Sequence, residues 1–156
     1  MRAFIDAGGA ALRIDALELA SGGDVVTRTL EWSRPRLREG PVLIYSTSDP
    51  ATVQAVQLQL GTGRAGSLVE HALGAVARGL VEQGVRQIIV AGGETSGACV
   101  QALDVTQLRI GPQIDPGVPW CYAQTKTFSP VGVHLALKSG NFGADDFFHK
   151  AFALLR

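Results

Sequence analysis

The chain has little of several features that mark other classes of protein. Its 156 residues include two cysteines and three lysines, and 14 basic side chains are balanced by 14 acidic ones. Two cysteines outside any Cys-x-x-Cys spacing are too few for a disulfide framework and favour a reducing cytoplasm. A net charge of zero argues against non-specific binding to nucleic acid or to a membrane surface. No apolar run approaches the roughly 20 residues that cross a bilayer.

The length predicts one domain spanning residues 1–156 with a single core. Its first residues contain no secretory signal, because Asp6 interrupts them and no apolar segment follows. The stretch from Phe4 to Ala7 before Gly8-Gly9 instead resembles the end of a helix with a glycine cap. A chain that opens inside a helix is expected to be a piece of a longer protein.

Hydrophobic periodicity predicts alternating helices and strands. Strands are expected at 25–32, 41–45, 85–91, 107–110 and 131–137, with a short apolar stretch at 11–14. Helices are expected at 15–21, from Pro50 after a cap at Ser48 or Asp49, at 67–83, at 98–103, and at 144–155 after a cap at Asp145 or Asp146. Three prolines between 112 and 119 predict an irregular loop. The order predicts an α/β fold, a layered αβα domain with a mainly parallel or mixed central sheet and helices on both faces.

A buried strand that ends in glycines is the most informative feature of the chain. The β-branched run Ile88-Ile89-Val90 is typical of a strand covered on both faces, and Gly92-Gly93-Glu94-Thr95-Ser96-Gly97 follows it. Glycines let the backbone approach a ligand closely, and the N–H groups at a helix start favour an anion. Thr95 or Ser96 would cap the helix or donate to a phosphate oxygen. The same pattern also occurs where a strand turns into a helix with no ligand.

A second glycine loop, Lys138-Ser139-Gly140-Asn141-Phe142-Gly143, follows the expected strand 131–137. If the two strands are neighbours, both loops leave the same sheet edge and could surround one polyphosphate. Lys138 would then face phosphate, although a lysine at a strand end also reaches water by itself. Asp145, Asp146 and Glu94 could help hold Mg²⁺ through phosphates or water, but helix capping is favoured for the aspartates, and no metal ligand is assigned.

Other chemistries fit the residues less well. The glycine loop lacks the lysine of a Walker A motif and does not match the Rossmann fingerprint. Thr95 stands where the Gly-x-Ser-x-Gly elbow of a hydrolase needs serine. His71, His134 and His149 have no acidic or sulfur ligands at metal-binding spacing, so structural or surface roles are expected.

Three segments together resemble the four-carbon acid sugar kinase family, over its carboxyl-terminal nucleotide-binding domain and essentially the whole chain. They are Gly92 to Gly97, Ile110 to Trp120 (IGPQIDPGVPW) and Leu135 to Gly143 (LALKSGNFG). The family's Gly-Gly-Glu-Thr loop maps onto Gly92 to Thr95, and its later loop contact maps onto Gly140. Lys138 and Asn141 are added on position alone. The candidate nucleotide-binding residues are Gly92, Gly93, Glu94, Thr95, Ser96, Gly97, Lys138, Gly140 and Asn141.

The resemblance implies transfer of the γ-phosphoryl group of ATP, with Mg²⁺, to the terminal hydroxyl of a tetronate or 3-oxo-tetronate. Family members carry an amino-terminal domain that supplies much of the sugar-acid site, and a serine motif that touches ATP. Neither is among these 156 residues, so the catalytic residues are unknown and the chain alone is expected to be inactive. A cytoplasmic enzyme, with a homo-oligomer left open, is the expectation. A non-catalytic module that binds a nucleotide or an anionic metabolite is the alternative, and a hydrolase is a third, weaker one.

Overall fold

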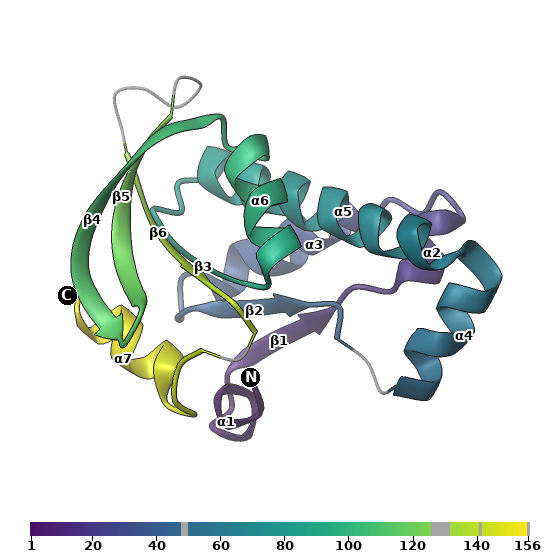
Figure 1. Cartoon of the computed structure of the whole chain (residues 1–156), viewed down its shortest axis with the longest axis horizontal. Helices are drawn as coiled ribbons and strands as arrows, with labels where there is room; N and C mark the ends of the chain where they lie inside the picture. Colours follow the sequence, from purple (N-terminus) through teal and green to yellow (C-terminus); the bar gives the residue numbers. More distant parts are fainter. Residues whose placement is uncertain (48–49, 126–131, 141, 156) are drawn as a thin grey trace.

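Two separate β-sheets form the framework of the chain (Figure 1). The computed structural model describes residues 1–47, 50–125, 132–140 and 142–155. The strands are β1 (Ala10–Arg13), β2 (Val42–Tyr45), β3 (Gln87–Ala91), β4 (Val105–Asp115), β5 (Val118–Thr125) and β6 (Val133–Lys138). β1 and β2 pair in parallel, and the second sheet has the order β3-β6-β5-β4, with one parallel pair and two antiparallel pairs. The expected α/β fold is confirmed in its mixed-sheet form.

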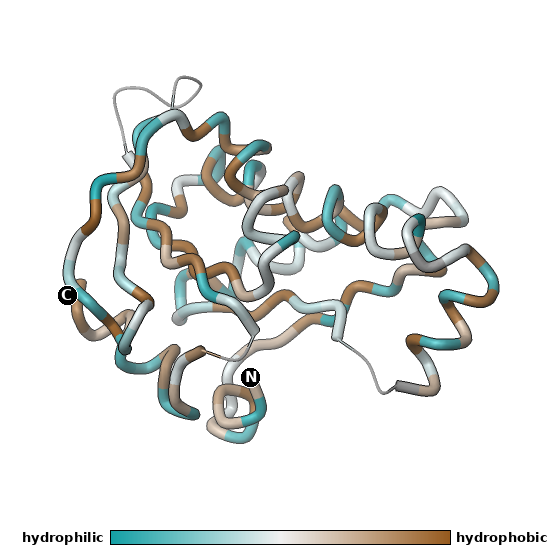
Figure 2. The backbone as a smooth tube through the Cα atoms, viewed as in Figure 1, coloured by the Kyte–Doolittle hydropathy of each residue, from teal (hydrophilic) through white to brown (hydrophobic). Residues whose placement is uncertain are grey.

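The helices are α1 (Arg2–Asp6), α2 (Ala16–Ala20), α3 (Val25–Arg36), α4 (Pro50–Leu60), α5 (Thr62–Glu82), α6 (Gly93–Ala102) and α7 (Phe147–Ala153). α7 covers one face of the four-stranded sheet, α5 and α6 cover the other, and α2, α3 and α4 pack against α5. Figure 2 shows hydrophobic stretches both on strands and on the helices that pack against them. No helix in the described part of the chain is long and apolar enough to span a bilayer.

Each face of the second sheet has its own buried cluster. On one face Trp120 packs with Phe147 of α7, and its indole Nε1 donates to the carbonyl oxygen of Ala151 at 2.8 Å. On the other face Leu135 packs with Val81 and Leu103, from the α5 and α6 side. Alternation along β5 and β6 sends successive side chains to opposite faces, which is why one strand serves both clusters.

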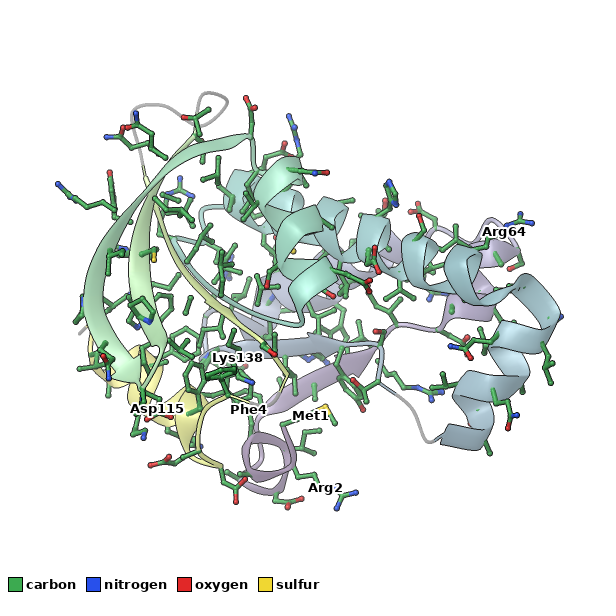
Figure 3. The ribbon with its side chains drawn as sticks, in the orientation of Figure 1. Met1, Arg2, Phe4, Arg64, Asp115 and Lys138 are labelled. Atoms are coloured by element: carbon green, nitrogen blue, oxygen red, sulfur yellow. The ribbon has the colours of Figure 1, made fainter. Side chains whose placement is uncertain are left out.

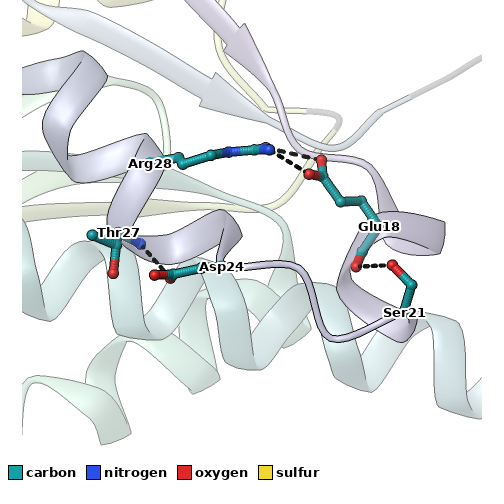
Figure 4. Close-up of polar contacts among 5 residues, drawn as sticks. All are labelled: Glu18, Ser21, Asp24, Thr27 and Arg28. Carbon is teal, nitrogen blue, oxygen red and sulfur yellow. Dashed lines mark hydrogen bonds and ion pairs between the residues drawn. The ribbon is translucent and has the colours of Figure 1, made fainter.

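Segment 25–32, expected as a strand, is instead the first part of α3. Asp24 caps this helix, because its Oδ1 accepts from the N–H of Thr27 at 3.2 Å (Figure 4). Val25, Thr29 and Ser33 are buried, and their spacing of four places them on one helical face. The prediction was wrong because a short apparent alternation was given more weight than this longer helical period.

The start of α2 behaves as predicted, since Asp15 Oδ1 accepts from the N–H of Leu17 at 2.8 Å. Glu18 of α2 and Arg28 of α3 then form a two-pronged ion pair, with N–O distances of 2.5 and 2.9 Å (Figure 4). Both side chains are exposed enough for solvent to screen them, so this pair orients α2 more than it stabilises the fold.

Segment 111–120, expected as an irregular loop, forms the turn of the β4–β5 hairpin and the adjoining parts of both strands. Its tip is a turn with Pro116 and Gly117 at the centre, where Gly117 has a φ of +78° and Asp115 pairs with Val118. Proline and glycine at these two positions favour a type II turn. Pro112 lies on the edge strand β4, where the register with β5 shifts between Ile110 and Gln113. The prolines therefore sit where a strand tolerates a missing N–H.

Helices α5 and α6 approach each other closely at Gly74. A Cβ placed on Gly74 would lie 3.1 Å from the carbonyl oxygen of Ala98 and 3.2 Å from the Cβ of Ala102. Cys99 packs at the same contact, where burial raises the pKa of its thiol to about 11. The thiol therefore stays protonated near neutral pH, as expected of a buried cysteine in the core.

Replacing Gly74 with valine should lower the free energy of unfolding by about 1–3 kcal/mol, the usual cost of overpacking. The backbone of α6 blocks the added atoms and would have to move. Urea denaturation measures the effect. Gly63→Val is the matched control, because a Cβ at Gly63, on the same helix, meets nothing within 4 Å. Equal stability of the two variants would contradict the close contact.

Candidate functional site

The two glycine loops emerge side by side, as the sequence predicted. β3 and β6 are parallel neighbours, with Ala91 opposite Lys138 at their carboxyl ends. Beyond this pair the N–H of Gly92 donates to the carbonyl oxygen of Lys138 at 2.9 Å. This bond ties the first residue of one loop to the strand end that begins the other.

The first loop becomes a helix almost at once. Gly92 has a φ of +124°, a conformation that favours glycine, and α6 begins at Gly93. Among the described residues no side chain caps this helix at Gly92. The capping role expected of Thr95 or Ser96 is therefore not seen. The first N–H groups of α6 lack acceptors within the helix and point out of its N-terminus, where the helix dipole favours an anion.

Lys138 lies over its own loop. Its Nζ donates to the carbonyl oxygens of Ser139 at 3.2 Å and Gly140 at 3.3 Å, and it lies 5.8 Å from the centre of the Phe147 ring. Partial burial lowers the pKa of this ammonium group. In this structure the ammonium group of Lys138 therefore hydrogen-bonds to the first residues of its own loop.

Asp115, at the tip of the β4–β5 hairpin, holds the other end of the second loop. Its Oδ2 accepts from the N–H of Ala144 at 2.9 Å, and its Oδ1 accepts from Nζ of Lys150 at 2.5 Å. Asp115 is 9% exposed, so this pair is sheltered from solvent on the Asp side. Figure 3 shows Asp115 and Lys138 at the same end of the molecule, with Arg64 at the far end. Lys150 also lies 3.5 Å from Asp146, which therefore has an ion-pair partner.

A pocket of about 420 Å³ opens beside the first loop. Glu94 and Thr95 form part of its wall from the first turn of α6. The carboxyl ends of β1 and β2 contribute the segments Arg13 to Ala16 and Ser46 to Thr47, while α4 and α5 supply the remaining side. The pocket thus joins the ends of the two-stranded sheet to the end of β3, which is where open parallel sheets bind ligands.

Some of the expected site residues lie in this arrangement and others do not. Gly92 to Thr95 and Lys138 to Gly140 meet at the junction of the loops, whereas Asn141 lies outside the described residues. Asp146 precedes α7 and makes no side-chain cap bond there. The described residues hold no group of three or more His, Cys, Asp and Glu side chains arranged to bind a metal.

The sequence analysis missed the contribution of the first sheet. Arg13 ends β1 and Asp15 follows it, while Ser46 and Thr47 follow β2, yet none of them was proposed for the site. The available signal was polar residues directly after two short apolar strands, a pattern typical of ligand sites at strand ends. It was overlooked because neither strand is followed by glycines.

Comparisons with known proteins show a matching family model and several similar proteins. A family model described as "Nucleotide-binding C-terminal domain" matches residues 2–148. A curated Pseudomonas fluorescens protein named 3-oxo-tetronate kinase is 56% identical over 153 residues, which cover 98% of this chain and 34% of that protein. The chain thus spans about a third of the length of this relative.

Two solved structures share the fold. A crystal structure of the Haemophilus influenzae protein HI1011 has a TM-score of 0.86 and 32% identity, and the match covers 99% of this chain and 37% of that one. A Bordetella bronchiseptica protein, described as a domain-swapped dimer with bound citrate, has a TM-score of 0.68 and 19% identity over 96% of this chain and 34% of that one. At this identity the second likeness shows the fold alone.

The Asp115 contacts predict a pH-dependent stability. The hydrogen bond from Lys150, followed by that from Ala144, holds the pKa of Asp115 below its ordinary value. A depressed pKa favours the charged form in the folded protein, so its contribution is complete above an ordinary pKa of about 3.9 and is lost as pH falls through the lower folded value. Asp115→Asn should therefore lower the free energy of unfolding at pH 7, and the gap to the unmodified chain should shrink below about pH 4.

Urea denaturation between pH 3 and pH 7 measures this gap. Asp145→Asn, at an exposed position near the same loop, is the control and should change the free energy of unfolding by less than about 0.5 kcal/mol at either pH. A deficit in Asp115→Asn that stays constant across the pH range would show that the ion pair does not carry the effect.

Proposed function

The chain belongs to the family of nucleotide-binding carboxy-terminal domains, and on that premise we propose that it binds ATP, with Mg²⁺, as part of a kinase for a four-carbon sugar acid. The observation that carries the proposal is the parallel pairing of β3 with β6, which brings two glycine loops to one edge. The relatives named 3-oxo-tetronate kinase support a tetronate-type acceptor, phosphorylated at its terminal hydroxyl.

The nucleotide's phosphates are proposed to lie over the N-terminus of α6, beside the second loop. N–H groups at a helix start can hold phosphate oxygens without any cationic side chain. The proposed nucleotide-binding residues are Gly92, Gly93, Glu94, Thr95, Ser96, Gly97, Lys138, Gly140 and Asn141. Mg²⁺ binds largely through phosphate oxygens and water, so a protein cluster of several carboxylates is not required for it.

The whole chain, 1–156, is proposed to act as one nucleotide-binding domain, and a further domain would hold the sugar acid. Relatives about three times as long support this division of labour. Phosphoryl transfer depends mainly on positioning and charge stabilisation, so a nucleotide-binding half can be complete for binding and incomplete for transfer. The use of ATP and a small sugar acid suits a cytoplasmic enzyme. The fold is also compatible with a homo-oligomer.

Replacing Gly93 with valine should remove detectable nucleotide binding, a loss of at least about 100-fold in affinity. A Cβ at Gly93 meets nothing within 4 Å, so the fold accommodates valine while its methyl groups occupy the space in front of the helix. Calorimetric titration with ATP and Mg²⁺ measures the loss. Gly63→Val should bind like the unmodified chain. Unchanged affinity in a folded Gly93→Val variant would remove this loop from the site.

The chain alone should transfer no phosphoryl group to a sugar acid, because holding the acceptor in line accounts for roughly 7–11 kcal/mol of such a barrier. The test is a transfer assay with a panel of tetronates and 3-oxo-tetronates. It is run on this chain by itself and after mixing with the amino-terminal part of the Pseudomonas fluorescens relative. Turnover by the chain alone would contradict the missing acceptor site. Nucleotide binding without transfer in either assay would favour a non-catalytic binding module.

A further inference from the structure

The segment from Ile110 to Trp120 is the one of the three motif segments that the proposed function leaves unused. It forms the tip of the β4–β5 hairpin and the adjoining strand ends, whereas the proposed phosphate position involves only the two glycine loops. Through Asp115 and Gly117 the tip lies against the far end of the second loop. The segment is therefore placed to act on that loop.

Asp115 makes two hydrogen bonds from the hairpin tip. Its Oδ2 accepts from the N–H of Ala144, directly after the loop, at 2.9 Å. Its Oδ1 accepts from Nζ of Lys150, on α7, at 2.5 Å. Because Asp115 is buried, water competes little for either bond. One carboxylate thus joins the hairpin to the end of the loop and to the helix that follows it.

Two aromatic rings pack on either side of the Asp115–Ala144 bond. The ring of Phe142 lies against the hairpin, since a Cβ placed on Gly117 would be 3.4 Å from its Cε1. The ring of Phe147 lies against Gly143, where an added Cβ would be 2.7 Å from its Cδ2. The end of the loop is thus packed between the hairpin tip and the start of α7.

The hairpin and α7 give these contacts a firm base. Trp120 is fully buried, and its indole Nε1 donates to the carbonyl oxygen of Ala151 at 2.8 Å. Ile114 and Val118, on the two sides of the tip, belong to the same buried cluster as Phe147. A change confined to the tip should therefore loosen the loop while this cluster stays packed.

From these contacts we infer that Asp115 is a positioning residue for the nucleotide. It acts through Ala144, whose N–H it holds, and so keeps the second loop in the conformation that lies beside the phosphates. The inference rests on the proposed function and adds to it a residue that belongs to neither glycine loop. A loop that adopts its binding conformation for only part of the time lowers the apparent affinity by that fraction.

Asp115→Ala tests this role, because it removes both hydrogen bonds. Affinity for ATP with Mg²⁺, measured by calorimetric titration, should fall at least about tenfold, as for a loop that keeps its binding conformation about a tenth of the time. NMR relaxation of the ligand-free variant should show lower backbone order at Gly140 and Gly143. Backbone order at Glu94 and Thr95, in the first turn of α6, should stay unchanged.

Asp115→Asn separates positioning from stability. Its amide oxygen can still accept from Ala144 although the ion pair is lost, so ATP affinity should stay within about threefold of the unmodified chain. Val25→Ala is the matched control, because it opens space in the buried cluster around α3 and lowers stability without touching the loop. Urea denaturation gives the stability of each variant. Loss of ATP affinity in step with loss of stability across these variants would overturn the inference.

Phe142→Ala is a second test that leaves Asp115 in place. The Phe142 ring is 50% exposed, so its removal should cost little stability. It ends the contact with Gly117, and both ATP affinity and backbone order in the loop should fall. Leu154→Ala, which removes a side chain of similar exposure, 46%, just after α7, is the matched control and should change neither.

The outcomes distinguish this inference from the proposed function. Full ATP affinity in folded Asp115→Ala, or in Phe142→Ala, would overturn the positioning role and leave the proposed function standing. Unchanged backbone order of the loop in Asp115→Ala would overturn the positioning role whether or not ATP binds. Failure of the unmodified chain to bind ATP would overturn the proposed function and the inference with it.

Discussion

The parallel pairing of β3 with β6 is the contact on which the rest of the site depends. Its register sets Ala91 opposite Lys138, so two loops far apart in the sequence begin at the same level. A slip of one residue would turn Leu135, which is fully buried, to the wrong face of the sheet. Each face of this sheet has its own packed cluster, so the cost of forcing such side chains into the wrong cluster fixes the relative position of the loops.

Helix α5 packs against both sheets and so links the four-stranded sheet to the rest of the molecule. Val76 and Leu80 pack in the cluster between α3 and the two-stranded sheet, while Val81 belongs to the cluster on the four-stranded sheet. Close approach to neighbouring helices is possible because α5 has glycine where they cross, at Gly74 beside α6 and at Gly79 beside Leu30 of α3. One long helix thus holds both sheets in a defined relation, and the pocket lies between them.

Sequence reasoning found the elements whose signals are local. The helix 67–83, the strand 85–91 and the convergence of the two glycine loops follow from periodicity, glycine punctuation and strand order, and the structure confirms them. The hairpin of β4 and β5 was missed because Pro112 and Pro119 were read as breakers. Pro112 is tolerated on the edge strand β4, and Pro119 lies at a register shift just before the part of β5 that pairs with β6. Both features exist only after folding. The same holds for the pocket, whose wall combines residues from Arg13 to Thr95 and has no single motif.

Because the strands form two separate sheets, the two sheets should differ in how easily they open. β1 and β2 contribute only four residues each, and a ladder so short has little cooperativity of its own. It should open as a sub-global unit at lower free energy than the four-stranded sheet, so its amide hydrogens should exchange with solvent sooner. A ligand that touches both units would tie their opening together. Exchange at Leu12 and Ile44 would then report on ligand binding at the carboxyl end of β3.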